Sequence, residues 1–296
     1  MKNLKQTIFS LVFLFVISNI FSQIYDSSFH NKLIEKKYLR VVSLSPAITE
    51  IIFSLNANHL LFARTDFCDF PEETKNIPSC GGFDGKTLSL EKIISFSPDL
   101  VFVVRGMHDH LIKPLQKMKI AVYVSEVNTI ENLFYEILSV GKLLGNDETA
   151  VNYCNDLKSR IRIVKDKISK ITLNEKNINK PKIFWQVDYS PYITVGKNSF
   201  INEMIECVDA KNIFSDIKNA YPIVSEESIV VRNPDAIIIP NYEELKIVFP
   251  KSWNNINAVK NNKIIFIDAS ISTRSSGRFV ECIEIMANQL YGIENK

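Results

Sequence analysis

Short apolar runs alternate with amphipathic stretches through the first half of the chain. The runs that we expect to form buried strands lie at residues 40–44, 60–64, 99–104 and 121–124. Between them, apolar residues spaced three and four apart predict helices at 46–55, 89–96 and about 110–118. Strands that alternate with helices pair in parallel, so this pattern predicts an N-terminal α/β lobe over residues 36–145.

The second half repeats this alternation. Apolar runs predict strands at 182–187, 235–239 and 263–267, and helical spacing predicts helices at 200–207, 226–232 and 277–291. We therefore expect a second α/β lobe over residues 181–296.

A single long helix is expected between the two lobes. The helix before it is predicted to be capped by Asn128 and ended by Gly145, and Asn146 then caps the long one. Apolar residues recur at spacings of three and four from Val151 to Ile171, so the bridging helix 146–171 would be roughly 37 Å long. The predicted fold class is α/β, with two Rossmann-like lobes of mostly parallel sheet bridged by one long helix.

Two segments of the chain are approximate copies of each other. Residues 89–103 align without a gap on residues 225–239, and each copy reads as a serine cap, a short helix, a Pro-Asp break and an apolar strand. A unit that occurs twice at this separation indicates two lobes of related build, with a cleft between them. Glu91 and Glu227 occupy matching positions. Acidic residues are common in a first helical turn, but their repetition indicates one face for a two-fold partner.

The N-terminus has the layout of an export signal. Lys2 and Lys5 precede an apolar core from Ile8 to Ile17, which is too short to span a membrane. We expect residues 1–22 to be a cleaved signal peptide, and the mature protein to be periplasmic, monomeric and not embedded in the membrane. The net charge of +2 over 296 residues provides no field for nucleic acid, so no nucleic-acid partner is expected.

Five cysteines leave the disulfide pattern open. Pairs between Cys68 and Cys80 and between Cys207 and Cys282 are each conceivable in an oxidising compartment, and sequence cannot decide either. Cys154 falls on the apolar stripe of the long helix, where it is most simply a small buried side chain.

Signatures of catalysis are mostly absent. The chain contains no phosphate-binding glycine loop in a strand-to-helix context, no nucleophile elbow and no zinc-protease motif. His108 and His110 follow a predicted strand and are weak candidates for haem or metal contacts. A simple helix N-terminus at this point is the favoured interpretation, because two ligands alone do not make a site.

Aromatic residues in predicted loops are the main candidates for contacts in the cleft. Phe67, Phe83, Tyr192 and Tyr221 lie beside Asp, Gly or Pro, where burial by the protein alone is less expected. Rings that face one cleft suit a large flat ligand, and Arg274 is a candidate donor to its polar edge.

At this point the residues resemble a known family. The similarity covers about residues 38–290 and rests on RVVSLSPAITE at 40–50, TDFCDFP at 65–71, GGF at 81–83, LEKI at 90–93 with PDLV at 98–101, PY at 191–192 with GK at 196–197, NIF at 212–214, YPIVSEE at 221–227 and NPDAI at 233–237. These segments resemble the periplasmic cobalamin- and iron-chelate-binding proteins of ABC importers, and the cobalamin-binding branch is the most similar.

The resemblance implies a solute-binding protein without catalysis or cofactor. A corrinoid would be held between the lobes by Phe67, Phe83, Tyr192, Tyr221 and Arg274. Glu91 and Glu227 correspond to the glutamates that dock on arginines of the membrane permease, so the implied partners are the permease and its ATPase. Two alternatives stay open: a haem or ferric-siderophore carrier, for which His108, His110 and Tyr192 could contact iron, and an exported α/β hydrolytic enzyme.

Overall fold

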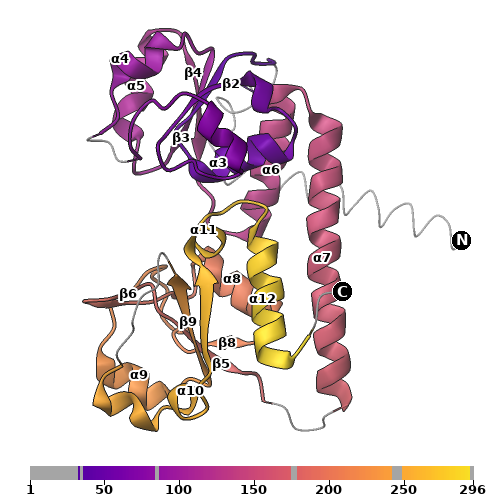
Figure 1. Ribbon diagram of the computed structural model, residues 1–296, viewed down its shortest axis with the longest axis vertical. Helices are drawn as coiled ribbons and strands as arrows, with labels where there is room; N and C mark the ends of the chain where they lie inside the picture. The colour runs from indigo at the N-terminus through magenta and orange to yellow at the C-terminus, as the bar shows by residue number, and fades with distance from the viewer. Residues whose placement is uncertain (1–32, 34–35, 84–86, 175–178, 242–248, 294–296) are drawn as a thin grey trace, which may run out of the picture.

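The computed structural model describes residues 33, 36–83, 87–174, 179–241 and 249–293. The expected signal peptide, residues 1–22, lies outside the described residues. Two lobes lie one above the other along the long axis of the molecule, and one helix runs along the side of both (Figure 1).

The N-terminal lobe is built on a parallel four-stranded sheet in the order β2-β1-β3-β4. Its strands are β1 (Val41–Ser43), β2 (Leu61–Arg64), β3 (Leu100–Val104) and β4 (Ala121–Ser125). Its helices are α3 (Pro46–Ser54), α4 (Leu90–Ser95), α5 (Asp109–Lys117) and α6 (Ile130–Leu144), with 3₁₀ turns η1 (Asn58–Leu60) and η2 (Glu72–Asn76).

The C-terminal lobe has a second parallel four-stranded sheet in the order β10-β9-β5-β8, and a small antiparallel hairpin, β6-β7. The strands are β5 (Lys182–Trp185), β6 (Asp188–Tyr189), β7 (Tyr192–Ile193), β8 (Lys211–Asn212), β9 (Ala236–Asn241) and β10 (Ile264–Asp268). The helical elements are α8 (Phe200–Cys207), α9 (Glu226–Arg232), η3 (Lys251–Asn255), α10 (Asn257–Lys260), α11 (Ala269–Ser272) and α12 (Phe279–Tyr291). Two parallel-sheet lobes joined by a long helix confirm the predicted fold class.

The structure confirms the predicted serine cap in each copy of the internal repeat. The hydroxyl of Ser89 accepts a hydrogen bond from the Lys92 amide (3.3 Å), and the hydroxyl of Ser225 accepts one from the Ser228 amide (3.2 Å). Each bond satisfies one of the amides that a helix N-terminus leaves without a partner. One expected cap is wrong: α6 is capped by the Thr129 hydroxyl, which accepts from the Asn132 amide, and not by Asn128.

The long helix α7 (Asp147–Asn174) connects the lobes. It begins and ends slightly later than the expected 146–171. Its apolar face, which includes Leu157, Val164 and Ile168, belongs to one buried cluster that also contains core residues of both sheets. The guanidinium of Arg160 makes a bidentate pair with Glu284 of α12 (2.9 and 2.7 Å), so the second lobe is also fixed to this helix. A core that is continuous from lobe to lobe ties their relative positions together.

All five cysteines are buried and free. The Cys68 thiol lies 3.2 Å from the hydroxyls of both Thr49 and Thr65. Neither of the two conceivable disulfides is formed. Burial raises the pKa of the Cys80 thiol to about 12, so this sulfur is held as an unreactive thiol.

Candidate functional site: a cavity between the lobes

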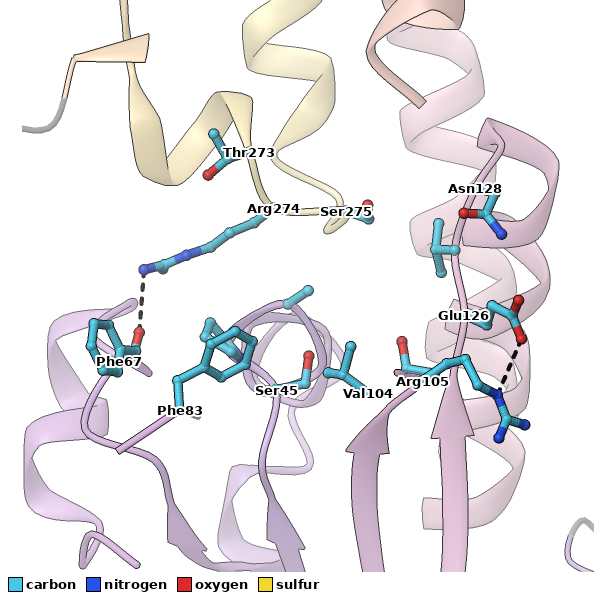
Figure 2. Close-up of a pocket in the computed structure, with 14 residues that line it drawn as sticks. Ser45, Phe67, Phe83, Val104, Arg105, Glu126, Asn128, Thr273, Arg274 and Ser275 are labelled. Atoms are coloured by element: carbon cyan, nitrogen blue, oxygen red, sulfur yellow. Dashed lines mark hydrogen bonds and ion pairs between the residues drawn. The ribbon is translucent and has the colours of Figure 1, made fainter. Parts of the chain in front are cut away.

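A cavity of about 600 Å³ lies where the carboxyl ends of the N-terminal strands face the second lobe. Its lining comes from the turns after β1, β3 and β4, from two aromatic loops, and from the α11–α12 connection: Ser45, Pro46, Ala47, Phe67, Phe83, Val104, Arg105, Ser125, Glu126, Val127, Asn128, Thr273, Arg274 and Ser275 (Figure 2). Parallel α/β sheets bind ligands at this edge, because the strand ends leave a crevice there.

Two phenylalanines form an aromatic wall on one side of the cavity. The ring centroids of Phe67 and Phe83 lie 6.2 Å apart with the ring planes tilted by 55°. Phe67 remains 58% exposed. The wall therefore offers apolar area that the protein itself does not cover.

His108 is a fully buried side chain behind this wall. Its Nδ1 accepts a hydrogen bond from the Val104 amide (3.0 Å), and its Nε2 lies 2.7 Å from the Phe83 carbonyl oxygen, to which it donates. The imidazole also meets the Phe83 ring edge-to-face at 5.6 Å. Because both nitrogens are engaged, His108 positions the aromatic wall and offers no free nitrogen to a metal. Burial lowers the pKa of His108, which keeps the ring neutral.

Arg274 enters the cavity from the second lobe and bonds to the first. Its guanidinium contacts the carboxylates of Glu50 (2.9 Å) and Asp69 (2.7 Å) and donates to the Phe67 carbonyl (3.2 Å; Figure 2). Glu50 is almost fully buried in α3 and also accepts from the Ser276 hydroxyl (2.5 Å). Burial raises the pKa of Glu50, and the hydrogen bonds from Ser276 and Arg274 oppose that shift. This cluster ties the lobes together at the mouth of the cavity.

A second arginine lies on another side of the cavity. The guanidinium of Arg105, just after β3, lies 3.4 Å from Glu126 and 3.5 Å from Asp109 (Figure 2). All three side chains are about half exposed, so these pairs contribute little to stability. Arg105 and Glu126 nevertheless belong to the lining of the same cavity as Arg274.

Two predicted contact residues do not line this cavity. Tyr192 stacks on the buried Trp253 (5.5 Å between centroids, 29° between planes) and packs with the core of the second lobe. Tyr221 is half exposed beside Ile223, which bridges to β7 at Ile193. The structure thus brings together Phe67, Phe83 and Arg274, and places both tyrosines elsewhere in the C-terminal lobe.

The two repeated glutamates are exposed on α4 and α9. Glu91 accepts a hydrogen bond from the Ser89 hydroxyl (2.7 Å), which lowers the pKa of its carboxyl. Backbone and Ser225 hydrogen bonds lower the pKa of Glu227 in the same way. Helices α4 and α9 lie on the side of the molecule away from α7, one on each lobe (Figure 1).

Four charged residues around the cavity were not found by sequence reasoning: Glu50, Asp69, Arg105 and Glu126. Arg105 and Glu126 carried a usable signal, because Arg105 directly follows the predicted strand 99–104 and Glu126 lies two residues beyond the predicted strand 121–124, each at a carboxyl end. Among the described residues, no group of three or more His, Cys, Asp or Glu side chains is arranged to hold a metal ion.

Two parallel-sheet lobes, one connecting helix and a cavity at the strand ends between them define a solute-binding protein. The chain belongs to the periplasmic binding protein family, whose family model matches residues 41–271. Members of this family deliver solutes to ABC importers, working with a permease and an ATPase, and are not enzymes. The alternative of an exported hydrolytic enzyme is therefore set aside. No helix within the described part of the chain has the length and apolar character to cross a membrane.

Curated relatives and solved structures agree with this membership. The chain is 28% identical over 272 residues to an uncharacterized ABC transporter substrate-binding lipoprotein of Bacillus subtilis, covering 90% of this chain and 84% of the relative. It is 25% identical over 284 residues to the vitamin B12-binding protein of Vibrio campbellii, covering 95% and 98%. A possible iron-binding periplasmic solute-binding protein of Staphylococcus epidermidis superposes with a TM-score of 0.74 at 28% identity, covering 86% of this chain and 100% of that one.

Proposed function

We propose that this protein captures a corrinoid in the cavity between its lobes and delivers it to the permease of an ABC importer. The observation that carries the proposal is the lining itself. The exposed ring of Phe67 and the partly buried ring of Phe83 line the same cavity as hydroxyl and amide side chains such as Ser45 and Asn128. A corrinoid has broad apolar faces and a rim of uncharged amides, so both kinds of lining group find a partner.

Relatives named as vitamin B12-binding proteins support the proposal. They match this chain at 22–25% identity over 85–95% of its length. The lining also differs from a haem site, since proteins hold haem iron through His, Cys, Met or Tyr side chains. None of the described residues that line the cavity is of these types.

An iron chelate is the second candidate. The S. epidermidis relative, described as a possible iron-binding protein, is as similar in sequence as any relative above. On this chain, however, an iron contact from His108 would require breaking both of its hydrogen bonds, and Tyr192 is not among the residues that line the cavity.

A titration separates the two candidates. Purified protein is mixed with cyanocobalamin, haemin or a ferric siderophore, and binding is followed by absorbance and equilibrium dialysis. We expect cyanocobalamin to bind with a Kd near 10 nM, about −11 kcal/mol, and the other two at least about a hundredfold more weakly. Tight binding of haemin or the siderophore without cyanocobalamin binding would replace the corrinoid proposal.

We further propose that Glu91 and Glu227 dock on arginines of the permease. Both carboxylates are exposed and ionised, and stand on matching helices of the two lobes. The double change Glu91→Arg with Glu227→Arg should abolish uptake of cyanocobalamin in cells that carry the cognate importer and leave ligand affinity unchanged. The control is Glu131→Arg on α6, an exposed carboxylate outside these helices. Normal uptake by the double variant would disprove this docking.

Residues 1–22 are proposed as the signal that exports the chain, which leaves a mature protein of the two lobes 36–145 and 181–296 with the connecting helix. The mass of the protein recovered from the periplasm tests this, since retention of Met1 would exclude cleavage.

A further inference from the structure

Every guanidinium that lines the cavity is already paired with carboxylates. Arg274 contacts Asp69 at 2.7 Å and Glu50 at 2.9 Å, and Arg105 contacts Glu126 at 3.4 Å and Asp109 at 3.5 Å. Arg278, which is not among the residues that line the cavity, also lies 3.7 Å from Glu50. The two arginines of the lining thus face four carboxylates, one of which is shared with a third arginine. A ligand that enters the cavity meets no uncompensated positive charge from these two arginines.

The four carboxylates differ in how they are held. Glu50 is 2% exposed and also accepts a hydrogen bond from the Ser276 hydroxyl, so it is a fixed part of the contact between the lobes. Asp69 is 60% exposed in the loop that carries Phe67, and Glu126 is 44% exposed and lines the cavity itself. Asp109 is 48% exposed at the start of α5 and is not among the residues that line the cavity. Glu126 on the cavity wall and Asp69, which pairs with the lining Arg274 at the rim, are therefore the carboxylates that we expect an incoming ligand to encounter.

This arrangement bears on which ligands can bind. An anionic ligand can reach either guanidinium only by displacing a carboxylate or by staying beside it, and like charges at short range are unfavourable. An uncharged ligand can accept hydrogen bonds from the remaining N–H groups of both arginines without disturbing the pairs. Unfavourable contacts with the wrong ligand are a general source of binding specificity.

We propose that Asp69 and Glu126 act as an anion filter, which neutralises Arg274 and Arg105 so that the cavity accepts uncharged, amide-bearing ligands and rejects polyanionic ones such as porphyrin dicarboxylates. The inference rests on the proposed function in one respect, that this cavity is where the ligand binds. It assigns specificity to two residues of the cavity wall and rim, apart from the aromatic wall that supplies apolar contact.

The test removes the two charges and keeps the shape of the side chains. The variants are Asp69→Asn, Glu126→Gln and the double variant. The probes are haemin, a flat ligand with two carboxylates, and cyanocobalamin, a flat ligand rich in amides. We expect the double variant to bind haemin at least about tenfold more tightly than the wild type, and each single variant about threefold. The deciding quantity is the ratio of haemin affinity to cyanocobalamin affinity in each protein, which should rise at least about tenfold in the double variant.

A matched control separates the filter from the effect of overall charge. Glu148→Gln combined with Asp166→Asn removes the same two charges from exposed positions on α7, which does not line the cavity. This control should leave haemin affinity at the wild-type value. The gain in the double variant should also weaken as salt is raised, because it depends on newly uncompensated arginines.

The outcomes keep the filter distinct from the proposed function. Unchanged haemin affinity in a folded double variant, or an equal gain in the α7 control, would overturn the filter even if the wild type binds cyanocobalamin. Tight haemin binding by the wild type would also overturn it. If the wild type fails to bind cyanocobalamin but the double variant gains haemin, the filter stands and the corrinoid proposal falls. If loss of Asp69 prevents folding, Glu126→Gln alone decides by its expected threefold gain.

Discussion

Buried polar side chains set the geometry of the cavity one residue at a time. His108 joins two of its walls, since one ring nitrogen accepts from the Val104 amide and the other donates to the Phe83 carbonyl. A neutral histidine is the one side chain that can accept at one nitrogen and donate at the other in this rigid arrangement. The orientation of Phe83 therefore depends on a residue that does not line the cavity.

Two substitutions separate the two bonds of His108. His108→Asn keeps an acceptor near the Nδ1 position but cannot reach the Phe83 carbonyl, whereas His108→Gln keeps a donor near the Nε2 position. Losing one net hydrogen bond of about 1 kcal/mol should weaken cyanocobalamin binding about fivefold in His108→Asn, and less in His108→Gln. Hydrogen exchange at residues 79–83 should rise in His108→Asn only. Equal exchange in both variants would contradict a positioning role.

Glu136 is a second buried polar residue, on α6. Its carboxyl receives a hydrogen bond from the Ser125 hydroxyl (3.1 Å), and burial raises its pKa to about 8. The folded state then holds a proton that the unfolded state, with the ordinary pKa of 4.5, releases as pH rises. Stability should fall between pH 4.5 and 8 by up to about 1.4 kcal/mol per pH unit.

Glu136→Gln should remove this dependence, because an amide cannot ionise. Urea unfolding of the wild type and the variant at pH 5 and pH 8 measures it, and the variant should gain relative stability at pH 8. Glu131→Gln, an exposed position on the same helix, should leave the wild-type slope in place. A wild-type slope that survives in Glu136→Gln would show that other groups cause it.

At the scale of helices and strands, most of the fold could be predicted from the sequence. Helices α4 and α9 were predictable because their serine caps, first-turn glutamates and Pro-Asp breaks are local signals, and the structure contains both caps. Strands β6, β7 and β8 were missed because two residues each are too few to show periodicity. The predicted cap of α6 was one residue too early, because Asn128 and Thr129 are both good capping residues.

The candidate site was less predictable than the fold, for a physical reason. Position in a loop selected Phe67, Phe83 and Arg274, which line the cavity, but it equally selected Tyr192 and Tyr221, which do not. The pairing of Arg274 with Glu50 and Asp69 joins residues 224 and 205 positions apart, which no local pattern encodes. Glu50 in particular sits in an apolar helix, where only the packed structure shows that its charge has partners.

The serine caps also orient the exposed glutamates that we propose for docking. Ser225→Ala should lower the free energy of unfolding by about 1 kcal/mol, because the Ser228 amide loses its partner. Ser89→Ala should have a similar effect and also release the Glu91 carboxylate, which Ser89 holds at 2.7 Å. Chemical denaturation measures both. Ser95→Ala, in the last turn of α4, should be neutral, and a comparable loss there would mean that capping is not the cause.

At the scale of the whole molecule, the lobes are linked by more than the connecting helix. The buried core continues along α7 from one lobe to the other. The Glu203 carboxylate of α8 accepts a hydrogen bond from the Ile130 amide at the start of α6 (2.7 Å). The Glu50 carboxylate of α3 accepts hydrogen bonds from the Arg274 guanidinium and the Ser276 hydroxyl. Widening the cavity would break these links together, so we expect small lobe movement on binding.

Interrupting α7 at an exposed position tests this rigidity without removing core packing. Arg162 lies exposed near the middle of the helix. Proline at this position removes one helical hydrogen bond and clashes with the preceding turn, at a cost of about 3 kcal/mol. Arg162→Pro should therefore kink α7. In small-angle X-ray scattering, the wild type should change its radius of gyration by less than about 1 Å on adding cyanocobalamin, as expected where no wide hinge closure occurs. Arg162→Pro should be wider without ligand and contract measurably with it, whereas Arg162→Ala should behave as the wild type. A wild type that itself contracts by several ångströms would mean that the lobes close on a hinge despite the continuous core.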